Sequence, residues 1–127
     1  MLLRLKDIVV NSLKMLAEGT LGACKHDDCM YVYPDGSRCT AGAGMTNEMI
    51  GHIVSTSQNT SNVNMLDKIE LDYSDRIVGL QMAHDKWARS KSVTSFAYSP
   101  EKEAEKKGEY LNMLMEQLVE LPELYEC

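Results

Sequence analysis

Side chains at helical spacing constrain this chain more than any other feature. In residues 3–18, 75–89 and 100–121, apolar side chains recur every three or four positions, so each segment would bury one face as a helix. Gly19 follows the first segment as a natural stop, and Pro122 follows the last. The chain is therefore predicted to be mostly helical. The stripe positions are Leu5, Ile8, Val9, Leu13 and Leu16, then Ile77, Leu80, His84 and Trp87, and finally Leu111, Leu114, Met115, Leu118 and Leu121.

A β-hairpin is predicted in residues 29–42, CMYVYPDGSRCTAG. Its first five residues favour a strand, and the Pro-Asp-Gly sequence at 34–36 has the backbone preferences of a tight turn. With these three residues as the loop, Tyr31 would pair with Cys39. Cys29 and Cys39 would then be diagonal neighbours on one face, roughly 7 Å apart between Cβ atoms, which is too far for an unstrained disulfide.

These elements predict an α+β fold, mostly helical, in which four to five helices pack on one β-hairpin. The 127 residues are enough for one small globular domain, residues 1–127, with a single core. Thr46 or Asn47 is expected to cap a helix that follows the glycine-containing turn. The wholly polar segment STSQNTSN, about residues 55–62, is predicted to be a flexible loop.

Charge and apolar pattern argue against two classes of partner. The formal net charge of -6 is unsuited to a nucleic-acid binder, which needs a basic patch for phosphates. Charged and polar residues interrupt the apolar start of the chain, so it resembles neither a signal peptide nor a membrane span. We therefore expect a protein of the cytoplasm with no membrane partner, in which the four cysteines are thiols.

Two kinds of cysteine chemistry are conceivable around the predicted hairpin. Cys24, His26, Cys29 and Cys39 offer four zinc ligands, but their spacing is not the paired CxxC pattern of a typical zinc site, so we expect no cofactor and keep zinc as an alternative. Cys29 and Cys39 are interpreted as buried structural residues.

A cysteine nucleophile is the second conceivable chemistry. Cys39, His84 and Asp85 have the right residue types for nucleophilic catalysis. However, neighbours on a helix point about 100° apart, so His84 and Asp85 are not expected to act on one another. Cys39 is expected inside a strand, with no helix start after it to lower its pKa. These arguments favour a protein without catalytic residues.

A third alternative is a small-ligand or nucleotide site. Such a site needs a concave pocket with a few aimed polar groups. Tyr31, Tyr33 and Arg38 could line it together with the neighbouring glycine-containing turn. The segment TAGAGMTNE itself is better explained by close backbone packing, for which Gly42 leaves room.

Two segments together resemble a group of small uncharacterised bacteriophage and prophage proteins. These share a Cys-x-Tyr…Gly-x-x-Cys-x-x-Gly hairpin and, later, a Leu-Gln-x-x-His-Asp helix. The chain departs from the pattern at Ala43, Thr46 and Asn47, where the group has Cys, Pro and Asp, so chemistry that uses the second cysteine is not expected here. The matching residues are Cys29, Tyr31, Gly36, Cys39, Gly42 and Glu48 in the hairpin, and Leu80, Gln81, His84 and Asp85 in the helix.

The resemblance implies a phage origin and a scaffold role for the shared residues. We expect His84 to hydrogen-bond the hairpin backbone and Asp85 to cap a neighbouring segment, with Gln81 beside them. We further expect a non-catalytic accessory protein that binds and inhibits a protein of the bacterial host, such as a defence or regulatory factor. The Met- and Leu-rich last helix could also join two copies into a homo-oligomer.

Overall fold

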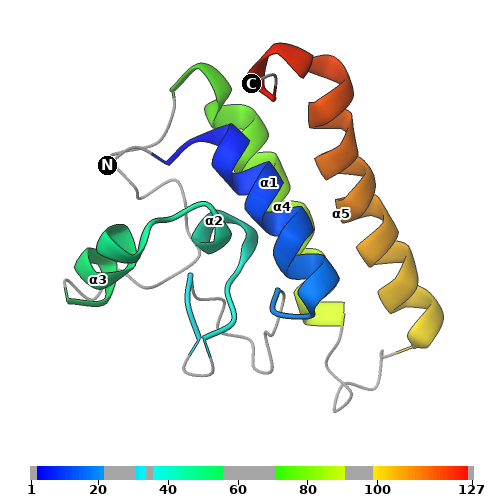
Figure 1. The fold of residues 1–127 in the computed structure, drawn as a ribbon. Coiled ribbons are helices and arrows are strands. Elements are labelled where there is room, and N and C mark those ends of the chain that lie inside the picture. Colours follow the sequence, from blue (N-terminus) through cyan, green and yellow to red (C-terminus); the bar gives the residue numbers. More distant parts are fainter. Residues whose placement is uncertain (1–2, 22–30, 34–35, 56–70, 91–98, 126–127) are drawn as a thin grey trace.

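The computed structural model describes residues 3–21, 31–33, 36–55, 71–90 and 99–125 (Figure 1). These residues form five α-helices and two short 3₁₀ helices. The α-helices are α1 (Leu5–Glu18), α2 (Thr40–Ala43), α3 (Asn47–Ser55), α4 (Ser74–Ser90) and α5 (Pro100–Glu120), and the 3₁₀ helices are η2 (Leu71–Tyr73) and η3 (Pro122–Leu124). None of the described helices is long and apolar enough to cross a membrane.

Three long helices form the body of the molecule. Helix α4 packs along α5, and α1 lies against both α4 and the short helix α2 (Figure 1). In the predicted stripe of α1, Leu13 and Leu16 are only partly buried, although they pack against the core. The rest of that stripe and the whole stripe of α4 are confirmed, because these residues are fully or almost fully buried in the common core. They are Leu5, Ile8 and Val9 of α1, and Ile77, Leu80, His84 and Trp87 of α4.

The predicted helix ends are also confirmed. Gly19 ends α1 in the left-handed conformation, with φ of 76°. Thr46 Oγ1 accepts a hydrogen bond of 3.2 Å from the Met49 N–H at the start of α3, and Ser99 Oγ accepts one of 3.1 Å from Lys102 N–H at the start of α5. These ends follow from local chemistry, since a side-chain oxygen satisfies an N–H that has no partner inside its helix. Of the predicted polar loop, Ser55 ends α3 and residues 56–62 lie outside the described part.

The predicted β-hairpin is wrong, because the described residues contain no strand. The described residues that flank Pro34 and Asp35 agree with the predicted turn: Gly36 has φ of 88°, and the Tyr33 N–H donates a hydrogen bond of 2.8 Å to the Ser37 carbonyl. Beyond it, however, Val32 and Arg38 form a single isolated antiparallel bridge. The expected second strand is replaced by α2 from Thr40 onward.

Side-chain acceptors explain why the chain becomes helical at this point. The Cys39 sulfur accepts the Gly42 N–H at 3.3 Å, and the Gln81 side chain accepts the Ala41 N–H at 2.9 Å. These backbone donors are therefore not available to a partner strand. The expected pairing of Cys29 with this segment lies outside the described residues.

The predicted apolar stripe of α5 is wrong in part. Leu114 is buried, but Leu111 and Met115 are 36% and 46% exposed. The inward face is formed instead by Tyr110, Leu114 and Gln117. The difference arises because the second half of α5 is apolar on two sides, and periodicity alone does not say which side faces the core.

Candidate functional site

The short helix α2 lies at the centre of the candidate site. Its glycines allow neighbouring backbone to approach closely. A Cβ atom at Gly42 would overlap the Tyr31 carbonyl, and one at Gly44 would lie 2.5 Å from Ile8 Cγ1. The predicted role of Gly42 in close packing is therefore confirmed. All four residues of α2 are buried, so their polar groups need partners inside the protein.

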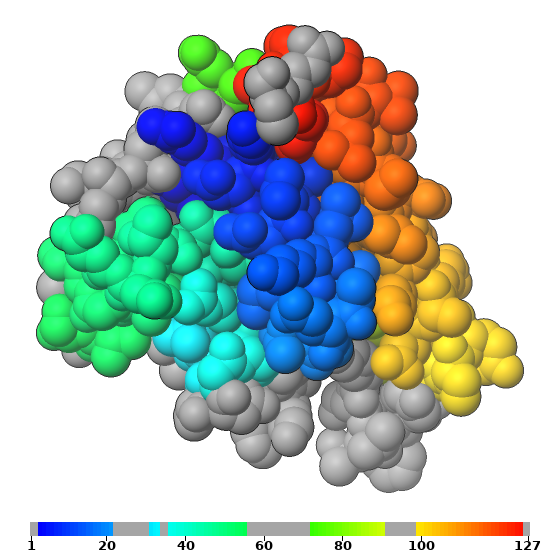
Figure 2. Space-filling model, in the orientation of Figure 1, coloured from blue at the N-terminus to red at the C-terminus, as the bar shows by residue number. Residues whose placement is uncertain are grey.

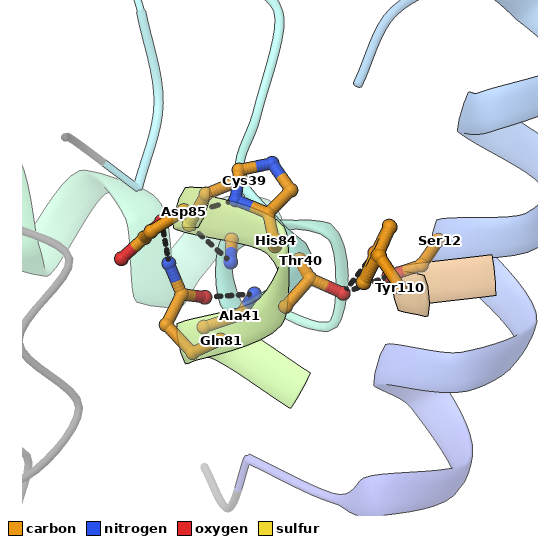
Figure 3. A network of polar contacts seen from close by, with 9 residues as sticks. Ser12, Cys39, Thr40, Ala41, Gln81, His84, Asp85 and Tyr110 are labelled. Atoms are coloured by element: carbon orange, nitrogen blue, oxygen red, sulfur yellow. Dashed lines mark hydrogen bonds and ion pairs between the residues drawn. The ribbon is translucent and has the colours of Figure 1, made fainter. Parts of the chain in front are cut away.

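A chain of three hydroxyl groups joins α2 to two long helices. The Thr40 Oγ1 atom lies 2.6 Å from Ser12 Oγ of α1 and accepts a hydrogen bond of 2.6 Å from the Tyr110 hydroxyl of α5 (Figure 3). All three side chains are fully buried. The sequence pattern alone does not point to these three residues. The available signal was Ser12, a small polar residue in line with the apolar stripe of α1, which is typical of a core hydrogen bond.

A second polar chain joins α2 to α4. Gln81 accepts the Ala41 N–H and donates to Asp85 Oδ1 at 2.9 Å, and the same carboxylate oxygen lies 3.1 Å from His84 Nδ1 (Figure 3). The prediction that His84 bonds the backbone of this segment is wrong for the described residues, because its Nδ1 lies beside Asp85 and its Nε2 has no partner there. Gln81 makes the backbone bond instead. The expectation that His84 and Asp85 do not interact is also wrong, since both side chains bend toward the same side of α4.

The imidazole of His84 is buried in an aromatic environment. Its ring meets the rings of Trp87 and Tyr110 edge-on, at centroid distances of 5.9 Å and 5.5 Å, and these two rings stack on each other. Its Nδ1 is held by Asp85, while its Nε2 is buried and has no hydrogen-bond partner among the described residues. Such an atom in a native core needs a specific explanation.

The thiol of Cys39 is free and fully buried. Burial raises the pKa of this thiol to about 12; the Gly42 N–H opposes the shift, and the Asp85 carboxylate adds to it. The expectation that no helix start follows Cys39 is wrong, because Cys39 caps α2. The cap nevertheless leaves the thiol protonated at neutral pH, and a protonated thiol is a poor nucleophile.

The three proposed ligand-binding residues differ in how they are used. Tyr31 is buried in the core, where burial raises the pKa of its hydroxyl, and Tyr33 is half-buried beside the turn. Arg38 donates to the carbonyl oxygens of Gly42 at 3.2 Å and Met45 at 3.0 Å. It also donates to the Asn47 side chain at 3.2 Å, so its guanidinium group secures the end of α2.

The zinc alternative depends mainly on residues that the structure does not describe. Cys24, His26 and Cys29 lie outside the described residues, and Cys39 lies inside them. Within the described ranges, no three residues of the His, Cys, Asp or Glu type are grouped so that they could hold a metal ion.

The polar cluster around α2 thus brings together four of the residues that the sequence predicts to matter. It gathers Cys39, Gln81, His84 and Asp85 and adds the three hydroxyl groups of Ser12, Thr40 and Tyr110. Its hydrogen bonds hold α2 between α1, α4 and α5. Comparisons with protein families, curated protein sequences and solved structures found no match to this chain.

Proposed function

We propose that this chain is a non-catalytic, phage-type accessory protein that binds and inhibits a protein of the bacterial host through the outer face of α5. The chemically versatile residues form a buried scaffold, and the apolar side chains available to a partner lie on the surface.

One observation carries the proposal: α5 has an apolar face that the rest of the described chain does not cover. We call it the α5 seam and define it as Ala104, Gly108, Leu111, Met115 and Val119. Their spacing of three or four residues puts them in one line along the helix. Val119 is 79% exposed and Met115 46% exposed, whereas the inward residues Tyr110 and Leu114 are fully buried.

The position of α5 supports the same proposal. The helix forms one margin of the molecule, and its N-terminal turns stand out at a corner (Figure 2). A partner helix could therefore reach the seam without displacing another element of the described structure. The inhibitory effect itself is proposed from the phage origin that the resemblance implies and from the acidic net charge of -6.

Site-specific photo-cross-linking in bacterial cells tests this function. A cross-linking amino acid at position Met115 reports on the seam. The same amino acid at position Lys102 is the matched control, because Lys102 is exposed on the same helix about 140° away. We expect a discrete adduct with a host protein from position 115 and not from position 102. Equal adduct patterns at both positions, or adducts of the chain with itself alone, would contradict the proposal.

A cysteine-dependent reaction is the second candidate, and one observation favours it. The Nδ1 atom of His84 is held by a carboxylate while its Nε2 lacks a described partner, which is how a carboxylate orients a general base. Iodoacetamide labelling of native protein at pH 7, followed by peptide mapping, tests whether Cys39 is reactive. Rapid labelling that His84→Leu abolishes would support this candidate. Labelling that requires unfolding would exclude it.

A further inference from the structure

The side chains beside the α5 seam have a strong charge bias. Glu105, Glu109 and Glu116 are exposed and lie about 80–120° around the helix from Met115, along one side of the seam. We call these three residues the acidic flank. Glu109 is paired with Lys106 at 3.4 Å, but Glu105 and Glu116 form no ion pair with a described residue.

The opposite side of the seam does not balance this charge. Lys107 lies on that side, and its ammonium group is 5.8 Å from the centre of the Trp87 ring. The lysine charge therefore already interacts with an aromatic ring of the same chain. Leu118, which lies beside the seam on the same side as Lys107, is apolar and half-buried. A partner that covers the seam therefore meets carboxylates along one edge and mostly apolar surface along the other.

Gly108 gives the seam its shape. A glycine inside a helix weakens that helix, and a Cβ atom at Gly108 would meet nothing within 4 Å, so core packing does not require it. With Ala104 it makes the N-terminal part of the seam shallow, while Leu111, Met115 and Val119 project from the C-terminal part. From residue 104 to residue 119 the seam is about 22 Å long, which matches four turns of a partner helix.

Building on the proposed function, we infer that the α5 seam binds an amphipathic α-helix of the host protein, with Lys or Arg residues along the edge that faces the acidic flank. The apolar side chains of that helix lie along the seam, and a large one fills the space over Gly108. Helix-in-groove recognition of this kind uses anchors at three- and four-residue spacing, and complementary charge selects the partner.

The charge distribution disfavours two other occupants. In an antiparallel pair of α5 helices, the acidic flank of one copy would face that of the other, and each chain carries a formal charge of -6. A helix that binds an anionic membrane surface carries Lys and Arg on its polar edges, and here the edge is acidic.

Two synthetic 21-residue helical peptides test the inference with the full-length protein. Both have the same Leu and Ala seam; one is flanked by Lys and the other by Glu. In fluorescence anisotropy at low salt, we expect the Lys peptide to bind roughly tenfold more tightly, and added salt to reduce the difference. In the variant Glu105→Lys with Glu116→Lys, the preference should reverse.

Gly108→Leu separates binding from folding. Leu is a better helix former than Gly and meets open space, so this variant should fold at least as stably as the original chain. It should nevertheless lose affinity for the Lys peptide, because the space over Gly108 is filled. Equal affinity for the two peptides, no binding of either, or unchanged binding by Gly108→Leu would overturn the inference.

The outcomes also distinguish this inference from the proposed function. A host adduct from position 115 without preference for the Lys peptide would leave the function in place and refute the basic helix. A dimer in sedimentation that Met115→Glu dissolves would assign the seam to a second copy and refute both.

Discussion

Among the described glycines, Gly42 has the closest neighbouring backbone. Any Cβ atom there would overlap the Tyr31 carbonyl, and backbone atoms move less easily than side chains. We expect Gly42→Ala to lower the free energy of unfolding by about 3 kcal/mol, measured by urea denaturation. Gly51→Ala is the matched control: Gly51 is exposed in α3 with open space around it, so alanine should add about 0.5–1 kcal/mol. Equal stability of the two variants would refute the close approach.

Arg38 has two conceivable roles, which are to secure the end of α2 and to bind a ligand. If its guanidinium group mainly holds the end of α2, Arg38→Met should lower the free energy of unfolding by about 1–2 kcal/mol, because the carbonyls of Gly42 and Met45 lose a charged donor. Urea denaturation measures this loss. Arg38→Lys should restore only part of the stability, since an ammonium group does not span the same acceptors. An Arg38→Met variant of unchanged stability would favour the ligand-binding role.

Which residues matter at the candidate site was partly predictable from sequence. The sequence indicates Gln81, His84 and Asp85, and the structure places Gln81 and Asp85 near the Cys39 thiol, with His84 beside Asp85. Their pairing was not predictable, because the angle between neighbouring positions on a helix does not describe how side chains bend. The roles of Thr40 and Tyr110 depend on contacts between residues 70 positions apart, which local pattern does not reveal.

At the scale of elements, α2 depends on tertiary contacts for its helical form. A four-residue helix is unstable in isolation, so tertiary contacts must hold it. We expect Thr40→Val to lower the free energy of unfolding by about 1–3 kcal/mol, since Ser12 and Tyr110 would lose the group that joins them. Thermal or urea unfolding measures this loss. Thr40→Ser keeps the hydroxyl and should cost less; a larger loss for Ser than for Val would refute the hydroxyl chain.

Elements whose ends depend on local side chains are predictable from the sequence. Helices α1, α3 and α5 begin or end at residues with local preferences, such as Gly19, Thr46 and Ser99, and these are visible in the sequence. Helix α2 is visible there only as a run of small residues after a β-prone segment. Its form depends on Gln81, 40 positions away from its backbone partner, so local pattern favoured a strand instead.

At the scale of the whole molecule, the described part of the core holds the protons of three weakly acidic groups, Cys39, Tyr31 and Tyr110. Burial raises the pKa of the Cys39 thiol from 9.0 to about 12 and raises those of the Tyr31 and Tyr110 hydroxyls above their usual value of 10.0. The unfolded chain releases these protons at lower pH than the folded chain does. The stability that they contribute is therefore complete below pH 9 and is lost as the pH rises toward the folded values.

This linkage predicts that the free energy of unfolding falls in two stages as the pH rises. Between pH 9 and pH 10 the thiol dominates, and the free energy of unfolding should fall by up to about 1.4 kcal/mol per pH unit; above pH 10 the tyrosines add to the loss. Urea denaturation at pH 8, 9, 10 and 11 under reducing conditions measures both stages. Cys39→Ser should flatten the first stage and keep the second, because serine does not ionise in this range. Identical pH dependence of the two proteins would mean that the thiol is not held protonated by the core.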